Sequence, residues 1–531
     1  MPRTPLATWT GRAAGAAVEQ IRSTSGSALT RREVLRAGAL GTAALVTARL
    51  GEMPAAADPG PRSAPRIVVV GAGLAGLCAA YALRKAGYRA TVVEASTRVG
   101  GRCWSYTSGE LGPGLVAEHG GELIDQGHTE IRQLASELDL DLDNLHAGEA
   151  SGTEPVNWFL GHEYSYEQAT EDIKAIWQTL HKDVAAASYP TLFNYYTQRG
   201  WELDHTSVYD YIEQVVPGGH GSPLGRLLDV AYTIEYGGDA AEQSSLNLLY
   251  LIAYSGQGQL RIFGPSNEKY HIRGGNELLV RRLAEVLADS IVLGAPLQSI
   301  VRNNDGTYRL GFSGMPAVTA DRVVLALPFS LLRQVDHSRA GFDAVKREAI
   351  AELPMGTNSK LHVRFDRRIW RDQGCNGETY ADLGYQNTWE VSRAQPGPAG
   401  ILVNYTGGTV GASYSPAAGT AQEYAARFID QIDPLIPGVA GVWDGRTATP
   451  GLLDRTPLDA RLVLVLESGS VHQLLRRREA AQRGLPLRRG AHQPGLPGLP
   501  QRCRRERPAS SSGDPRRPQV IDAAAPRPPR R

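Results

Sequence analysis

Residues 66–106 read RIVVVGAGLAGLCAAYALRKAGYRATVVEASTRVGGRCWSY and carry the strongest structural signal of the chain. The β-branched run of residues 66–70 is typical of a parallel strand that is buried on both faces. Gly71, Gly73 and Gly76 follow it with the G-x-G-x-x-G spacing. That spacing favours a tight turn, close approach of a pyrophosphate to the backbone, and close packing of the next helix on the strand.

A second strand and an acidic residue complete a nucleotide-binding unit. After a helix predicted from about Leu74 to Lys85, residues 90–93 read ATVV and lead into Glu94. A carboxylate at this distance from the turn can accept hydrogen bonds from an adenosine ribose. Because strand, glycines, helix, strand and acid occur in order, a dinucleotide site is favoured over purely structural glycines. Ala75 and Ala95 are further candidate contacts of the cofactor.

The next glycine turn narrows the choice of nucleotide that the chain is expected to bind. Gly100, Gly101 and Arg102 combine a turn with a cation that can pair with a phosphate. Together with the first unit, E-A-S-x-R-x-G-G-R resembles the FAD-binding start of the flavin amine oxidases, the family of monoamine, polyamine and L-amino acid oxidases. The resemblance implies an α/β fold: a Rossmann-like, doubly wound FAD-binding domain with a mixed sheet-plus-helix substrate domain. It also implies FAD as cofactor, with Gly101 and Arg102 among its contacts.

A third glycine turn lies in residues 117–125, AEHGGELID. In the resembled family this turn runs beside the flavin, which makes Gly120 and Gly121 candidate cofactor contacts. The resemblance makes Glu122 a further candidate, and the alternative is a helix or loop carboxylate that binds no ligand. His119 is expected to be a structural histidine rather than a catalytic base.

Two later segments resemble the family's return to the FAD domain. Residues 270–276 read YHIRGGN and lead into a helix predicted over residues 277–289. Leu297 occupies the place where the family commonly has a valine whose backbone meets adenine. Ala326 closes a strand in residues 321–332, DRVVLALPFSLL, as in the family. Leu297 and Ala326 are therefore further candidate cofactor contacts.

Lys360 is the candidate catalytic residue. It lies in residues 353–370, LPMGTNSKLHVRFDRRIW, which resemble the segment whose lysine reaches flavin N5 through a water. A buried ammonium there can stabilise negative charge or hold a water. The alternative is a solvent-facing lysine on a strand, and the functional interpretation is favoured. Trp389 and Tyr405 either face the substrate or pack in the core.

The middle of the chain predicts a helical substrate or lid region. Apolar residues recur at helical spacing in residues 167–188, 207–216, 225–236 and 241–254. Aromatic residues on amphipathic helices are usually core residues. We expect this for most members of one group: Tyr195, Tyr196, Trp201, Tyr209 and Tyr211.

Bulk properties exclude several classes of protein. The 531 residues carry a net charge of +1, so nothing global indicates nucleic acid or an anionic membrane. No stable membrane insertion is expected. The four cysteines lack C-x-x-C spacing, which argues against a zinc site and a disulfide framework. No metal is predicted, and a homodimer is one possible assembly.

The N-terminus resembles a twin-arginine signal peptide. Arg31 and Arg32 precede an apolar run to about Leu50 and an alanine triplet at residues 55–57. We expect export to the periplasm or the extracellular space. The alternative is a disordered basic leader.

The composition changes abruptly after Pro450, where arginine and proline dominate. The resembled family should close here with an F-A-G-E-H motif, which the chain lacks. Residues 487–507, LRRGAHQPGLPGLPQRCRRER, can be back-translated so that a one-nucleotide shift reads FAGEHTSQDFQGYLNGAVESG. We therefore hypothesise a single-base frameshift close to Pro450, which sequencing of the gene across codons 449–452 would test.

The function expected from these features is FAD-dependent oxidation of amines or L-amino acids, with hydride transfer to flavin and reduction of dioxygen to hydrogen peroxide. The alternatives are a frameshifted, inactive homologue that retains FAD poorly and a carotenoid-type FAD desaturase. The predicted organisation, in chain order, is: signal peptide 1–57; linker 58–65; first FAD-binding part 66–150; helical region 151–265; second FAD-binding part 266–340; substrate-domain sheet 341–449; and an aberrant, disordered tail 450–531.

Overall fold

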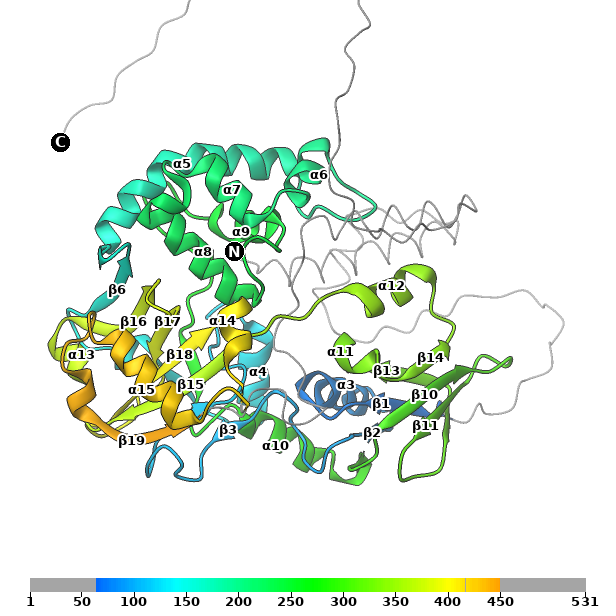
Figure 1. The fold of residues 1–531 in the computed structure, drawn as a ribbon. Coiled ribbons are helices and arrows are strands. Elements are labelled where there is room, and N and C mark those ends of the chain that lie inside the picture. The colour runs from blue at the N-terminus through cyan, green and yellow to red at the C-terminus, as the bar shows by residue number, and fades with distance from the viewer. Residues whose placement is uncertain (1–63, 416, 449–531) are drawn as a thin grey trace, which may run out of the picture. The chain divides into compact units, whose positions relative to one another are not determined.

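The computed structural model describes residues 64–448 except residue 416, and Figure 1 shows their arrangement. The predicted signal peptide, nearly all of the predicted linker and the predicted tail at 450–531 lie outside the described residues. Within the described range, no helix combines the length and apolar character needed to cross a membrane.

A four-stranded parallel sheet forms around the opening stretch, in the order β13-β1-β2-β9. Val69 and Val92 belong to a core shared with helices α3 and α10, whereas Val68 and Val93 pack on a second sheet. The strand is therefore buried on both faces, as its unbroken apolar run predicts. The bounds are Ile67–Val70 (β1), Ala90–Val93 (β2), Ile291–Val292 (β9), Arg322–Leu325 (β13), Leu74–Lys85 (α3) and Glu277–Val286 (α10).

The second face of the parallel sheet carries a small sheet in the order β12-β11-β10-β14. The predicted α/β fold is confirmed, and this sheet lies where a doubly wound fold carries helices. Ile300 and Leu310 supply its apolar contacts, since alternate residues of β10 and β11 point to the core. The bounds are Leu297–Arg302 (β10), Tyr308–Phe312 (β11), Val318–Ala320 (β12), Asp336–Arg339 (β14), Phe329–Leu332 (α11) and Ala344–Glu352 (α12).

A seven-stranded mixed sheet runs in the order β19-β15-β18-β17-β16-β6-β7. Lys360 and Asn387 each pair with Tyr405, so the three side chains share one face. Helices α13 and α15 pack on the opposite face. The bounds are Glu154–Phe159 (β6), His162–Glu163 (β7), Ser359–Phe365 (β15), Cys375–Ala381 (β16), Asn387–Glu390 (β17), Gly400–Thr406 (β18), Trp443–Ala448 (β19), Ile369–Asp372 (α13), Gly408–Ser413 (α14) and Ala421–Ile432 (α15).

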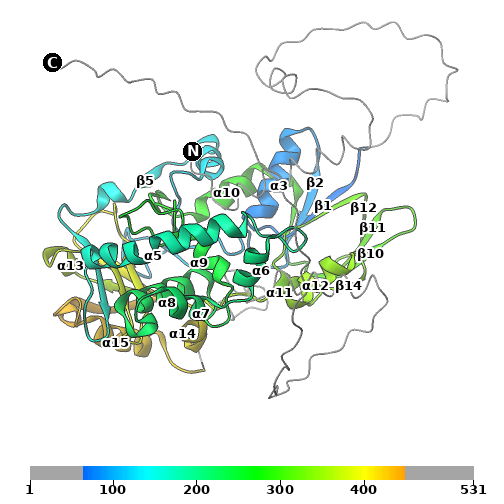
Figure 2. The ribbon, with the colours of Figure 1, turned by 90° about the horizontal axis from the view of Figure 1, so that it is seen from above.

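Helices α5 to α9 form a layer of their own, which Figures 1 and 2 show from two sides. The four predicted helices are confirmed, and α6 is an additional one. Ser165, Ser207, Ser222 and Ser244 begin four of them, because each side chain accepts a hydrogen bond from a backbone N–H of the first turn. The bounds are Tyr166–Ala187 (α5), Gln198–Asp204 (α6), Val208–Val215 (α7), Pro223–Tyr236 (α8) and Ser245–Ile252 (α9).

The prediction that most of the five aromatic residues named above are core residues is wrong. Tyr195 is 70% exposed, and Tyr196 and Tyr209 are also exposed, whereas Tyr211 is buried. Tyr195 and Tyr196 precede α6 instead of lying on an amphipathic helix, so the helical pattern does not govern them.

Short elements connect the layers. The pairing of β3 with β4 places Ser105 opposite Glu118, and β5 pairs with β8. The predicted domain bounds within residues 66–449 stay a prediction. The bounds of the short elements are Ser105–Tyr106 (β3), Ala117–Glu118 (β4), Thr129–Glu137 (α4), Leu142–Asn144 (β5), Tyr270–Ile272 (β8), and the 3₁₀ turns His146–Gly148, Gly219–Gly221, Ala288–Ser290 and Val439–Val442.

Candidate functional site

The first glycine turn joins β1 to α3. Gly71 has φ +102°, and a Cβ at Gly76 would lie 1.9 Å from the carbonyl oxygen of Gly71. These two glycines are therefore explained by the turn and by close packing of the helix. Gly73 is different, because a Cβ there would meet its nearest neighbour only at 4.0 Å. Ala75 is exposed in the first turn of α3.

Glu94 turns its carboxylate back toward this turn. Its Oε2 accepts a hydrogen bond from Ala72 N at 2.7 Å, and its Oε1 accepts one from Ser96 N at 2.9 Å. Each carboxylate oxygen has a second lone pair, so the oriented group can also accept ribose hydroxyls. Ala95 follows Glu94 and is partly buried.

Leu297 and Ala326 come to the same edge of the parallel sheet. Ala326 N donates to Val70 O at 2.9 Å, and the backbone of Ala295, two residues before Leu297, bonds to Glu94 O at 2.9 Å. Leu297 itself is buried at the start of β10. The fold therefore brings these residues together with the first glycine turn, at the carboxyl ends of the strands where ligands of such folds bind.

The three glycine turns lie against one another. Gly73 forms an isolated bridge with Gly100. A Cβ at Gly101 would lie 3.4 Å from Gly73 Cα, and a Cβ at Gly120 would lie 2.2 Å from Arg102 O. Gly120 is thus required by the second turn, whereas a Cβ at Gly121 would meet nothing within 4 Å. Arg102 keeps an exposed side chain.

Lys360 is buried beside the third turn and is only 5% exposed, so the solvent-facing alternative is wrong. Its Nζ donates to Gly120 O at 2.9 Å and to Glu122 Oε2 at 2.8 Å. An ammonium has three N–H donors, so one remains for a water or a ligand. Trp389 Nε1 donates to the other oxygen of Glu122 at 2.9 Å. The Trp389 and Tyr405 rings meet edge to face at 5.3 Å.

Glu122 therefore has partners within the chain. Burial alone would raise the pKa of this carboxyl, but the charge and hydrogen bond of Lys360, together with the Trp389 N–H, lower it to about 2. Lys360 and Glu122 form a buried ion pair at the point where the glycine turn meets the seven-stranded sheet.

His119 packs against two aromatic rings, and its predicted structural role stays a prediction. Its ring stacks on those of Trp104 and Tyr106, each at a centroid distance of 3.7 Å. Burial, with the charges of Arg98 and Lys360, lowers the pKa of His119 to about 3, so the ring is neutral.

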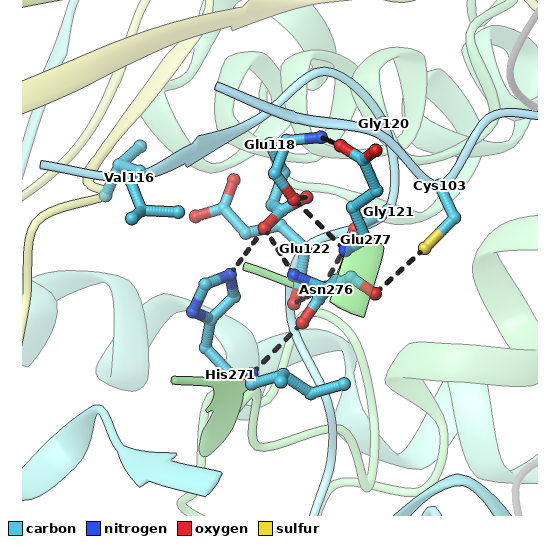
Figure 3. Close-up of polar contacts among 12 residues, drawn as sticks. Cys103, Val116, Glu118, Gly120, Gly121, Glu122, His271, Asn276 and Glu277 are labelled. Carbon is cyan, nitrogen blue, oxygen red and sulfur yellow. Dashed lines mark hydrogen bonds and ion pairs between the residues drawn. The ribbon is translucent and has the colours of Figure 1, made fainter. Parts of the chain in front are cut away.

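Buried polar residues lie against the third turn (Figure 3), and the sequence analysis did not predict them as site residues. Glu118 is fully buried; its Oε1 accepts from His271 Nε2 and from Asn276 N, both at 2.8 Å. Asn276 Nδ2 donates to the carbonyl oxygens of Gly121 and Glu122 at 3.1 and 2.7 Å. Burial opposes the charged form of His271, yet the hydrogen bond and charge of Glu118 raise its pKa. The one sequence signal was the polar ending of YHIRGGN.

Two carboxyl groups near Tyr405 titrate close to neutrality. Burial, reinforced by the charge of Asp125, raises the pKa of Glu235 to about 7. Burial and the charges of Glu378 and Glu235 raise the pKa of Glu268 to about 8. Both side chains are nevertheless accessible to solvent. They can therefore exchange protons with solvent near pH 7.

No cluster of His, Cys, Asp and Glu within the described residues is suited to a metal ion. The described cysteines, Cys78, Cys103 and Cys375, are free thiols, and Cys503 lies outside the described residues.

The chain is similar to several known proteins. Residues 74–454 match the model of the flavin containing amine oxidoreductases. An L-amino-acid oxidase of Mus musculus is 26% identical over 411 residues, which are 72% of this chain and 60% of that protein. A probable flavin-containing monoamine oxidase A of Dictyostelium discoideum is 24% identical over 60% of this chain and 69% of its own length. The chain thus spans about 60% of the length of the mouse relative. The solved structure of a putrescine oxidase variant has a similar fold, with a TM-score of 0.65 at 20% identity over 77% of this chain and 89% of that one.

Proposed function

Because this chain belongs to the flavin-containing amine oxidoreductase family, we propose that it is an FAD-dependent oxidase of amines or L-amino acids. The observation that carries the proposal is the buried Lys360 ammonium, held by Gly120 and Glu122 beside a glycine turn that is open at Gly121. Desolvation of two buried charges can cost more than their attraction returns, so a buried ion pair at this position favours a functional role.

The described residues fit a flavin dinucleotide. Neither Gly73 nor Gly121 is required by packing, and neither has a left-handed backbone, so at both positions the missing side chain leaves the backbone open to a ligand. Gly73 begins α3, whose N-terminal N–H groups suit a pyrophosphate. Glu94 would hold the ribose, and Gly121 would lie along the flavin.

The chemistry that bound FAD supplies is acceptance of a hydride from the carbon that bears the amino group, and delivery of two electrons to dioxygen to give hydrogen peroxide. The protein supplies the surroundings. Lys360 Nζ keeps one N–H for a water or for developing negative charge, while Glu122 balances its charge. The ring of Trp389 lies 5.3 Å from this ammonium and meets that of Tyr405 edge to face, and the two rings would offer an aromatic surface to the substrate.

The test is purification of the full chain with FAD, a visible spectrum, and a peroxide-coupled screen of amines and L-amino acids. We expect flavin absorption and peroxide formation with at least one substrate class. Lys360→Met should lower the rate by about 10²-fold or more, as loss of a charge-stabilising donor does. Lys346→Met, at an exposed lysine of α12, should leave it unchanged. A folded, colourless chain, or a flavin-loaded chain that forms no peroxide, would refute the proposal.

A further inference from the structure

Asn276 stands at the N-terminus of α10 but does not cap it. Asparagine is among the residues favoured at this position because its side chain can accept an N–H of the first turn. Here the side chain makes no such bond. Ser105, which lies far away in sequence, takes that place, since its Oγ accepts from Glu277 N at 3.1 Å. The Asn276 amide is therefore available for another purpose.

The side chain of Asn276 holds the third glycine turn (Figure 3). Nδ2 donates to Gly121 O at 3.1 Å and to Glu122 O at 2.7 Å. Oδ1 accepts from Ile272 N at 3.1 Å, so the amide cannot rotate without losing a bond. The residue is 6% exposed, and each of its side-chain polar atoms is engaged.

The backbone of Asn276 ties in the neighbouring segments. Its N–H donates to the buried carboxylate of Glu118 at 2.8 Å, and its carbonyl accepts from Cys103 Sγ at 3.3 Å. Cys103 directly follows the second glycine turn. Asn276 thus fixes the segment after the second turn and the carbonyl groups of Gly121 and Glu122 relative to α10.

Lys360, which lies on β15, also holds this turn. It bonds to Gly120 O and to the side chain of Glu122, while Asn276 bonds to the backbone carbonyl of Glu122. A shift of this backbone would carry the carboxylate away from the ammonium. The lysine cannot follow freely, because it is fixed in β15 opposite Tyr405.

We propose that Asn276 is a positioning residue for Lys360, acting through the Gly121 and Glu122 backbone that it binds. The role in turnover rests on the proposed oxidase function, but the positioning itself does not. Without the Nδ2 donor, the carbonyl groups of Gly121 and Glu122 lose this partner, and because the Glu122 bond is buried, the turn gains by moving toward water. The Lys360–Glu122 contact then opens part of the time.

The test measures the acylation rate of each lysine in the full chain by competitive labelling and mass spectrometry. Only an accessible, deprotonated amine reacts, so the buried, paired Lys360 is expected to react slowly. Asn276→Ala removes the donor. Asn276→Asp keeps the shape of the side chain and the acceptor for Ile272, but it places a carboxylate oxygen against the carbonyl oxygens of Gly121 and Glu122, which repel it. The matched control is Asn303→Ala, in the hairpin between β10 and β11. Lys182 and Lys346, both exposed, are internal references.

We expect both Asn276 variants to label Lys360 about tenfold faster than the parent, which is the effect of losing one buried hydrogen bond. The melting transition should persist, and Lys182 and Lys346 should be unchanged. An unchanged Lys360 rate in a folded variant, an equal change in Asn303→Ala, or loss of folding in both variants would overturn the proposal. Because no turnover is measured, an inactive parent chain would count only against the oxidase function.

Discussion

Replacing Glu122 and Lys360 singly and together tests whether they act as one buried ion pair. The two side chains are each 5% exposed and meet at 2.8 Å. Glu122→Gln removes the negative charge and keeps the shape. Lys360→Met removes the positive charge and keeps most of the length. The double variant leaves no uncompensated charge.

Two independent routes give the expected magnitude. At 2.8 Å and an effective dielectric constant of about 20, the Coulomb attraction is about 6 kcal/mol, and desolvation of both ions offsets part of it. The pKa of Glu122 is lowered from 4.5 to about 2. This difference corresponds to about 3 kcal/mol, which is present above pH 4.5 and is lost as the pH falls toward 2. We therefore expect each single variant to cost about 3–5 kcal/mol.

The assay is urea unfolding followed by tryptophan fluorescence and by far-UV circular dichroism. Agreement of the two probes checks that one transition is measured. Lys85→Met, Glu137→Gln and their combination provide a matched control, because this pair has a similar distance, 2.9 Å, on the surface. Exposed pairs couple by only about 0.2–1 kcal/mol.

The buried pair should show a coupling energy of about 3 kcal/mol, so the double variant should be much less destabilised than the sum of the single ones. Additive effects at Glu122 and Lys360, or equal coupling in the surface pair, would show that the charges are independently solvated and that the ion pair does not hold the turn.

Three further predictions concern single residues near the site. Gly120→Ala should prevent normal folding, since its Cβ would lie 2.2 Å from Arg102 O, whereas Gly121→Ala should leave the melting temperature unchanged but weaken FAD retention, measured by flavin absorbance after gel filtration. His119→Phe should abolish an acid-induced loss of stability: the folded pKa of about 3 lies below the ordinary 6.5, so the parent loses about 2 kcal/mol between pH 7 and pH 5, and an equal loss in the variant would exclude His119 as its source. Glu268 should give the parent the opposite pH dependence, because its folded pKa of about 8 lies above the ordinary 4.5. The parent should lose about 1–2 kcal/mol of stability as the pH rises from 4.5 to 8, once solvent screening of the accessible carboxyl is allowed for, and Glu268→Gln should remove this loss. Melting curves at pH 5, 7 and 9 would check both signs, and a parallel course for parent and Glu268→Gln would contradict the second.

The parts of the fold and site predicted from sequence are those with local signals. The strand, glycine turn and helix from Ile67 to Lys85 depend on neighbours within a few residues, and the structure has them at the expected places. Helices α5, α7, α8 and α9 follow from the spacing of their apolar residues. Lys360 was found through resemblance, because a lysine in a strand carries no local sign of burial.

The rest depends on contacts between distant segments. Glu118 and His271 are 153 residues apart, and Asn276 lies 154 residues from Glu122. Nothing in either segment alone indicates that their polar groups satisfy each other. The prediction that Tyr195 and Tyr209 are core residues fails for a related reason. An aromatic side chain becomes a core residue only where another element covers it, and both of these are exposed.

The candidate site therefore depends on glycines that let the turns pack together and on buried polar side chains that bond to them. Gly120 lacks a side chain because the Arg102 backbone passes there, and Gly101 has a left-handed backbone with φ +55°, whereas neither reason applies to Gly73 and Gly121. The first kind of glycine stacks the turns, and the second leaves the stack open to a ligand. Glycine turns have no side chains with which to contact one another, so buried polar groups of other segments must hold them in place. Asn276 and Lys360 both bond to the third turn, so under our proposal a change in the position of the turn also changes the position of the candidate catalytic lysine.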